Sequence, residues 1–211
     1  MSEFYDQALE AYLKGAGIPV TDRATALAAA KAKGLKTHYF KRSVALPRVR
    51  RVLGFLSGIS FSSLLDVGSG RGVFLWPFLE TFPDKEVHCV DLLPHRAELH
   101  RTVAAGGVFD LHPHEGDVRT MDLPDGSVDV VTMLEVLEHI PDVAGAIRNA
   151  VRMARQYVVV TVPAKADDNP EHIHLLTKDI LTDLFNAAGC RQLHFGGVPN
   201  HLFMVATCKA C

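Results

Sequence analysis

A buried apolar stretch that breaks into closely spaced glycines restricts the fold of this chain more than any other feature. Residues 64–74 read LLDVGSGRGVF, with glycines at 68, 70 and 72. Glycine at this density marks backbone that adopts positive φ angles or that another group approaches closely. The pattern predicts a strand, a glycine turn and a helix in that order. In open α/β sheets, ligands bind at such a turn, at the carboxyl end of the strand.

Strand and helix patterns alternate from about residue 62 onward. Four apolar runs lack strict polar alternation, which suits strands that are buried on both faces of a parallel sheet. Helical patterns separate these runs, and one of them begins at Pro94, where a first-turn proline is tolerated. The alternation predicts a doubly wound, mostly parallel sheet with helices on both faces. The predicted strands cover 63–67, 86–91, 127–134 and 157–162, and the predicted helices cover 71–81, 94–105 and 142–154.

The last part of the chain predicts one more helix and a hairpin. Thr177 suits the N-cap of a helix, and Gly189 suits its end. The two apolar runs that follow, QLHFGGV and HLFMVAT, are joined by a short turn at Pro-Asn. We expect these runs to close the sheet as an antiparallel hairpin.

The first 60 residues have a different character. Helical patterns cover about 3–14 and 22–33, each of them stopped by a glycine, and a third begins at Pro47. No strand pattern or long linker interrupts them. We therefore divide the chain into an N-terminal helical cap, residues 1–60, and a ligand-binding domain, residues 61–211.

Composition restricts the setting of the protein. The formal net charge is −2, so no overall field draws the chain to nucleic acid or to an acidic membrane. The N-terminus lacks the layout of a secretion signal, and no apolar run approaches the roughly 18 residues of a membrane span. The terminal pair Cys208 and Cys211 has no second pair that would complete a zinc site. We expect a cytoplasmic protein without membrane insertion.

One segment departs from this balance of charge. Residues 31–51 carry eight Lys and Arg residues and no acid. Such a run is ordinarily a solvated helix face, but it also suits recognition of phosphate, carboxylate or RNA. The sequence leaves both interpretations open, and it also leaves the oligomeric state and the substrate open.

The residues of the glycine loop disfavour two common ligands. A phosphate loop requires Lys followed by Ser or Thr, and no such pair follows here. A dinucleotide loop requires a third glycine at the position of Val73, so a dehydrogenase remains only a formal alternative. Asp66, two residues before Gly68, would repel a pyrophosphate but can accept hydrogen bonds from a ligand ammonium, directly or through water. The loop therefore favours a cationic amino-acid ligand.

Two further acids follow strand ends. Asp91 ends the second predicted strand, where a carboxylate hydrogen-bonds a ribose diol. Asp117 lies near the end of the next strand, and its carboxylate can accept a bond from an adenine amino group. Together these acids predict a ligand that contains adenosine.

The order D-x-G-x-G-x-G, then a strand-tip Asp, then Gly-Asp before a fourth strand resembles the class I S-adenosylmethionine-dependent methyltransferases. The resemblance covers roughly 60–208 and is closest to the methyltransferase type 11 and quinone-biosynthesis O-methyltransferase groups. It implies a Rossmann-like, mostly parallel seven-stranded sheet with an antiparallel C-terminal hairpin, and S-adenosylmethionine as the cofactor. On this resemblance, the cofactor-binding residues are Asp66, Gly68, Ser69, Gly70, Gly72, Asp91, Leu92, Asp117, Val118, Leu134 and Glu135.

A cluster of acids and histidines accompanies these motifs. The run TMLEVLEHIPD places Glu135, Glu138 and His139 after the fourth predicted strand. The loop after the fifth strand brings His172 and His174 to the same edge of the sheet. Such a set can perform acid–base chemistry or hold a hard metal ion. We expect His139 to act as the base, with His174 and then His172 as the next candidates, and Glu135 to take part in catalysis or to orient the cofactor.

The same cluster leaves the substrate open. It is similar to the small-RNA 3′-terminal 2′-O-methyltransferases, in which two Glu and two His residues hold a divalent ion; here these would be Glu135, Glu138, His139 and His174. It is equally similar to the quinone-biosynthesis O-methyltransferases, which act on small molecules. We expect methyl transfer to an O or N atom of a small-molecule metabolite, with a divalent metal not favoured. The alternatives are a metal-dependent RNA 2′-O-methyltransferase, which would use the basic segment, and a non-catalytic S-adenosylmethionine-binding protein.

Overall fold

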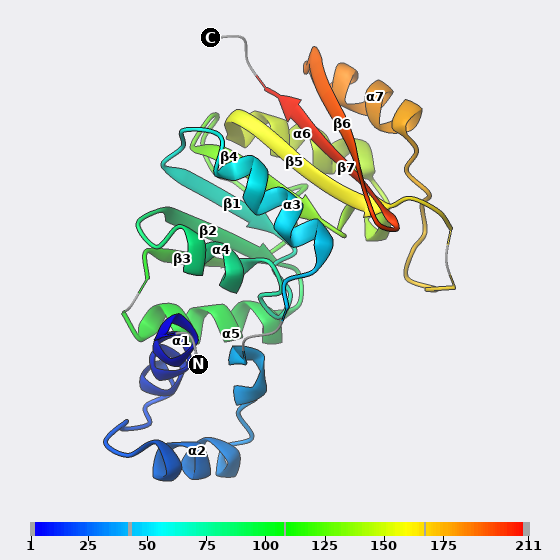
Figure 1. The fold of residues 1–211 in the computed structure, drawn as a ribbon. Helices are drawn as coiled ribbons and strands as arrows, with labels where there is room; N and C mark the ends of the chain where they lie inside the picture. The colour runs from blue at the N-terminus through cyan, green and yellow to red at the C-terminus, as the bar shows by residue number, and fades with distance from the viewer. Residues whose placement is uncertain (1–2, 42–43, 108, 167, 209–211) are drawn as a thin grey trace.

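Seven strands form one sheet (Figure 1): β1 (Ser63–Val67), β2 (Glu86–Asp91), β3 (Leu111–Glu115), β4 (Val128–Leu134), β5 (Ala154–Pro163), β6 (Gln192–Val198) and β7 (His201–Thr207). Their order is β3-β2-β1-β4-β5-β7-β6. Strands β1 to β5 are parallel, and β7 pairs antiparallel with both β5 and β6. The expected fold, a mostly parallel sheet with an antiparallel terminal hairpin, is confirmed. This computed structural model describes residues 3–41, 44–107, 109–166 and 168–208; Cys211 of the terminal cysteine pair lies outside them.

Helices cover both faces of the sheet (Figure 1): α3 (Pro47–Leu56), α4 (Leu75–Thr81) and α5 (Pro94–Ala105) on one face, and α6 (Val143–Met153) and α7 (Lys178–Ala187) on the other. Neighbouring residues of a strand point to opposite faces, so each strand supplies both halves of the core. Leu64 packs in the cluster that contains Phe78 of α4. Leu65, the next residue, packs with Ile147 of α6. None of the described helices is long and apolar enough to cross a membrane.

The N-terminal segment forms α1 (Glu3–Gly15), α2 (Arg23–Ala32) and the short 3₁₀ helix η1 (Thr37–Phe40). Helix α1 lies against α5, and α2 lies beyond it at the end of the molecule (Figure 1). The backbones of α1 and α5 approach very closely: a Cβ atom on Gly15 would lie 1.8 Å from the carbonyl oxygen of Thr102. Gly15 therefore permits this contact besides ending its helix. The boundary after residue 60 stays a prediction.

Most elements agree with the sequence-based ranges to within one residue, but β5 begins three residues earlier than expected, at Ala154, and two further elements differ more. Helix α4 begins at Leu75 and not at residue 71, because Gly72 has a φ of +82° and cannot belong to a right-handed helix. The range of β3 was not predicted, because its sequence LHPHE has almost no apolar pattern. Thr177 caps α7 as expected, and its hydroxyl accepts a bond from the Ile180 amide at 3.3 Å.

Candidate functional site

The glycine loop connects β1 to α4, and its glycines at 68, 70 and 72 all have φ between +58° and +82°. L-residues with side chains rarely adopt such angles. Two of these glycines also have close neighbours. A Cβ on Gly68 would lie 2.6 Å from Cγ2 of Val136, and one on Gly72 would lie 2.1 Å from Nε1 of Trp76. A Cβ on Gly70 would meet nothing closer than 3.7 Å, so the loop has open space at this position.

Asp91 ties the tip of β2 to this loop. Its Oδ2 accepts a hydrogen bond from the Gly70 amide at 2.8 Å, and its Oδ1 accepts one from the Leu93 amide at 2.9 Å. The guanidinium of Arg96 lies 3.9 Å from Oδ2. Only 4% of Asp91 is exposed. Each carboxylate oxygen can accept two bonds, so Asp91 keeps capacity for the hydroxyls of a ribose.

A cavity of about 480 Å³ opens at the carboxyl ends of the parallel strands, beside the loop and Asp91. This volume lies in the range of small-molecule sites. Of the residues predicted to bind the cofactor, the cavity is lined by Gly68, Asp91, Leu92, Asp117, Val118 and Glu135. Its lining does not include Asp66, Ser69, Gly70, Gly72 and Leu134. The predicted base His139 also lines the cavity, whereas His172 and His174 do not.

Asp66 lies behind the glycine loop and is 2% exposed. Its Oδ1 accepts a bond from the Thr132 hydroxyl at 2.8 Å, and its Oδ2 has no hydrogen-bond partner among the described residues. Burial raises the pKa of Asp66 to about 7, although hydrogen bonds from Ser69 and Thr132 lower it in part. In this conformation, contact between Asp66 and a ligand ammonium would require a bridging water or a shift of the loop.

This raised pKa predicts a pH dependence of stability. The folded state holds the Asp66 proton up to about pH 7, whereas an unfolded chain loses it near pH 4, so the stability that the proton confers is lost as the pH rises through 7. We expect the cofactor-free protein to lose on the order of 2–4 kcal/mol from this group between pH 5 and pH 8. Asp66→Asn should remove that loss in thermal unfolding curves. The exposed Asp84, changed to Asn, is the control, and equal pH profiles for wild type and Asp66→Asn would contradict the prediction.

Asp117 is held by a residue that the sequence analysis did not select. The guanidinium of Arg119 donates to both carboxylate oxygens, from Nε at 2.8 and 3.0 Å and from Nη2 at 2.5 Å. These hydrogen bonds hold the pKa of Asp117 below its usual range. If Asp117 accepts a ligand amino group as predicted, its carboxylate does so while it also holds Arg119. The signal for Arg119 was its spacing in Gly-Asp-Val-Arg, two residues after the acid.

Glu135 follows β4 in an unusual backbone conformation, with a φ of +59°. Its carboxylate accepts bonds from the Thr161 hydroxyl at 3.0 Å and from Nε2 of His201 at 2.9 Å. The other ring nitrogen of His201 lies 2.9 Å from the carbonyl oxygen of Pro199. His201 thus connects Glu135, which lines the cavity described above, to the backbone at Pro199, and no local sequence pattern pointed to it.

His139 ends the short helix η2 (Leu137–His139). Its Nδ1 lies 2.9 Å from the backbone carbonyl oxygen of Glu171, which can only accept. Nδ1 therefore carries the hydrogen, and the neutral ring keeps its lone pair on Nε2. This is the tautomer that a general base requires.

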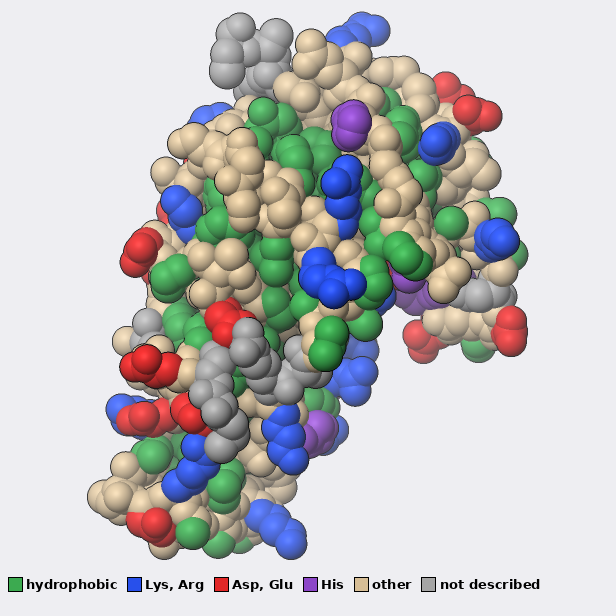
Figure 2. Space-filling view, viewed as in Figure 1, with side chains coloured by type: hydrophobic (Ala, Val, Ile, Leu, Met, Phe, Trp, Pro, Cys, Tyr) green, Lys and Arg blue, Asp and Glu red, His purple; other side chains and the backbone are tan. Residues whose placement is uncertain are grey.

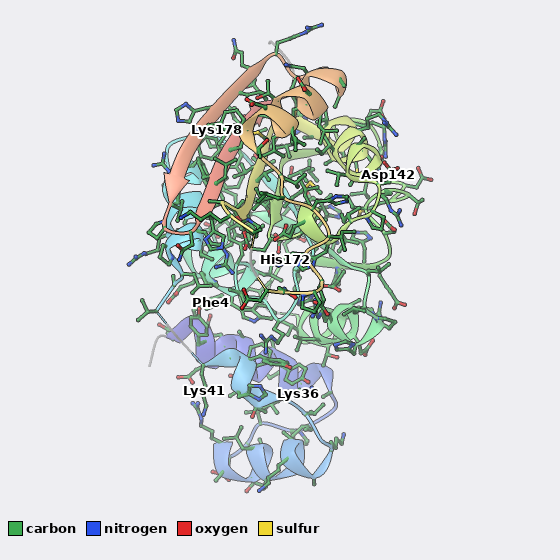
Figure 3. The ribbon with its side chains drawn as sticks, turned by 90° about the vertical axis from the view of Figure 1, so that its right-hand side faces the viewer. Phe4, Lys36, Lys41, Asp142, His172 and Lys178 are labelled. Atoms are coloured by element: carbon green, nitrogen blue, oxygen red, sulfur yellow. The ribbon has the colours of Figure 1, made fainter. Side chains whose placement is uncertain are left out.

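Glu138, His139 and His172 form a cluster whose potential ligand atoms lie within 4.8 Å of one another. Glu138 is fully buried. Figure 3 shows His172 near the middle of this side of the molecule, above Lys36 and Lys41. The other metal candidates lie apart: Glu135 pairs with His201, and Nε2 of His174 lies 3.1 Å from the carbonyl oxygen of Ile140. The structure therefore groups His172 with Glu138 and His139, whereas the sequence analysis named His174 as the second histidine.

The basic segment 31–51 spreads over α2, η1 and α3. On the side of the molecule drawn in Figure 2, Lys and Arg side chains are scattered over the surface. Some of its members make internal contacts. Lys33 donates to the carbonyl oxygen of Ala16 at 3.0 Å, and the Arg51 guanidinium lies 4.9 Å from the centre of the Phe203 ring. Arg42 lies outside the described residues.

Comparisons with known proteins agree with this geometry. Residues 65–160 match the sequence model of a family described as "Methyltransferase domain". Among similar solved structures, a SAM-dependent methyltransferase from Aquifex aeolicus has a TM-score of 0.63 and 20% identity over 78% of this chain and 90% of its own. One from Archaeoglobus fulgidus has a TM-score of 0.62 and 17% identity over 76% and 91%. The cyclase SpnF has a TM-score of 0.60 and 14% identity over 74% and 79%. No curated protein sequence matches significantly.

At these identities the solved structures show a shared fold, and SpnF carries the name of a different activity. The family match is the more specific finding. Its range contains the glycine loop, Asp91, Asp117 and His139.

Proposed function

Residues 65–160 form a class I S-adenosylmethionine-dependent methyltransferase domain, and from this we propose that the chain methylates an O or N atom of a small-molecule metabolite in the cytoplasm. The observation that carries the proposal is the cavity itself. It joins Gly68 and Asp91, on the cofactor side, to Glu135 and His139. Its volume of about 480 Å³ suits small ligands.

The residues present fit the cofactor. Bound S-adenosylmethionine supplies an electrophilic methyl group on a sulfonium. Asp91 would accept the ribose hydroxyls with its remaining lone pairs, and Asp117 would accept the adenine amino group beside Arg119. The open space at Gly70 lets the loop backbone approach a ligand. Asp66 lies behind the loop, and one of its buried carboxylate oxygens has no partner among the described residues. This oxygen would accept a hydrogen bond from the ligand ammonium, through a water or after a shift of the loop.

His139 would take the proton of the acceptor. Its Nδ1–H is held by the Glu171 carbonyl, so Nε2 is the atom that receives the proton, and the resulting imidazolium keeps its bond to Glu171. Glu135 is held by Thr161 and His201, so its carboxylate has a defined position at the wall of the cavity. We assign to it the orientation of the cofactor or the acceptor.

We expect His139→Gln to lower kcat by about 100- to 10,000-fold, the usual contribution of a general base. Affinity for S-adenosylhomocysteine should stay within about twofold, because the change leaves the glycine loop and Asp91 intact. The measurement is S-adenosylhomocysteine release with a panel of hydroxylated and amino metabolites, followed by kcat on the best acceptor. His174→Gln is the matched control, since that ring also bonds a backbone carbonyl, that of Ile140, but does not line the cavity. An unchanged kcat and pH profile in His139→Gln would contradict the assignment of the base.

The grouping of Glu138, His139 and His172 favours one alternative, a metal-dependent RNA 2′-O-methyltransferase. Activity that is lost in EDTA and restored by Mg²⁺ or Mn²⁺ would select this alternative over metal-free transfer to a metabolite. RNA binding through the basic segment would weaken steeply with salt. Tight S-adenosylhomocysteine binding without transfer to either class of acceptor would indicate a non-catalytic protein.

A further inference from the structure

Three histidines share one face of the sheet at its β2–β3 edge. His88 of β2 is in register with His112 of β3, and His114 lies two residues further along β3, on the same face. The opposite face of β3 presents Leu111 to the core that contains α5. The connection from β3 to β4, residues 116–127, contains no helix that would cover the histidines. The face is accessible, since the side chain of His112 is 46% exposed and that of His88 is 17% exposed.

The hydrogen bonds of this histidine cluster determine which ring nitrogens carry hydrogen. His88 Nε2 lies 3.1 Å from a carboxylate oxygen of Glu86, which accepts, so Nδ1 of the neutral ring keeps its lone pair. Likewise, His112 Nε2 lies 2.8 Å from Asp110 and leaves Nδ1 with a lone pair. His88 Nδ1 lies 3.0 Å from Nε2 of His114. The imidazoles of His88 and His112 thus each donate their Nε2–H to a carboxylate. Nδ1 of His88 and Nε2 of His114 face each other.

We propose that His88, His112 and His114 form a binding site for a divalent first-row transition cation, Zn²⁺ or Cu²⁺. Zinc–nitrogen bonds of about 2.0–2.1 Å place two tetrahedral ligands about 3.3 Å apart, close to the 3.0 Å between His88 Nδ1 and His114 Nε2. Without a cation, His114 Nε2 donates to His88 Nδ1; on binding, His114 changes to the Nδ1–H tautomer, so that Nε2 is free for the cation. His112 supplies the third nitrogen after rotation of its exposed ring, and water completes the coordination.

The surroundings favour metal binding at neutral pH. Glu86 and Asp110 hold the outer nitrogens of His88 and His112, as outer carboxylates do for metal-bound imidazoles. The ring of His114 reaches the same face from β3, so the three imidazoles come from two neighbouring strands of a rigid sheet. A site made of imidazoles selects Zn²⁺ or Cu²⁺ over Mg²⁺ or Ca²⁺, which prefer oxygen ligands.

The test is calorimetric titration of the chelator-stripped full chain with Zn²⁺ at pH 7.5. Because Glu138, His139 and His172 form a second cluster, the titration uses a His139→Gln/His172→Gln background. We expect one site there, weakened at least tenfold by adding His88→Gln/His114→Gln and unaffected by His95→Gln on α5. Binding should also weaken sharply at pH 5.5, because protons compete for the imidazoles.

Two further measurements make the result independent of folding defects. Zn²⁺ should raise the Tm of the background protein and leave that of the His88→Gln/His114→Gln variant unchanged, while both unfold cooperatively without metal. Bound Cu²⁺ should show nitrogen hyperfine coupling in its electron paramagnetic resonance spectrum. Zn²⁺ binding that survives His88→Gln/His114→Gln, or that is absent from the His139→Gln/His172→Gln background, would overturn the proposal.

Discussion

Changing Asp91 to Ala is expected to weaken S-adenosylhomocysteine binding by about 100-fold or more. The buried carboxylate accepts the amides of Gly70 and Leu93, so its removal releases the glycine loop from the tip of β2. It also removes the proposed acceptor for the ribose hydroxyls. Hydrogen bonds to charged groups contribute about 1.5–3 kcal/mol each. The loss of the two bonds to the ribose hydroxyls therefore weakens binding by about 100-fold or more. Calorimetric titration with S-adenosylhomocysteine measures the effect.

The matched control is Glu115→Ala. Glu115 ends the neighbouring strand β3, where it pairs with Arg101 at 2.9 Å and does not line the cavity. Its removal should change the affinity by less than about twofold, as is usual for exposed ion pairs. Asp91→Asn should fall between wild type and Asp91→Ala, because it keeps an acceptor oxygen but loses the charge. A folded Asp91→Ala protein with wild-type affinity would refute the proposed ribose site.

A second large effect is expected at the contact between α1 and α5. Gly15→Ala should destabilise the protein by about 3 kcal/mol, at the upper end of the cost of overpacking. The new Cβ would lie 1.8 Å from the carbonyl oxygen of Thr102, a backbone atom that cannot move aside without bending α5. Gly106 makes the reciprocal contact, 2.2 Å from the Ala11 carbonyl oxygen, so Gly106→Ala should act in the same direction. Urea unfolding at equilibrium measures both variants.

Gly54→Ala in α3 is the control for helix propensity. A Cβ on Gly54 would meet no atom within 4 Å, so this change should be neutral or should stabilise by up to about 1 kcal/mol. If Gly15→Ala were as stable as Gly54→Ala, α1 would not dock on α5 in the manner described.

Local sequence patterns were sufficient to predict much of this fold. The apolar run at 86–91 became β2 within those bounds, and α5 begins at Pro94, because strand burial and proline geometry act over a few residues. The glycine loop was equally clear, since its three positive φ angles require glycine whatever the rest of the chain does. The expected class of ligand followed from the acids that accompany the loop at strand ends.

Other features depend on residues that are distant in the sequence. Glu135 and His201 meet because β7 lies antiparallel beside β5. The two residues are far apart in the sequence, so no local sequence pattern predicts that they pair. His172 and not His174 joins Glu138, because the loop after β5 has no period that would tell which side chain turns inward.

The sequence alone thus determined the strand–helix alternation, the glycine loop and the kind of ligand, because these arise from short-range conformational preference and from acids at strand ends. Tertiary structure alone decided which partners the site residues have. It also decided that Gly15 serves helix packing and that His88 and His114 face each other across β2 and β3. The physical reason is that a parallel sheet brings distant segments together, while their side-chain contacts depend on strand register and packing.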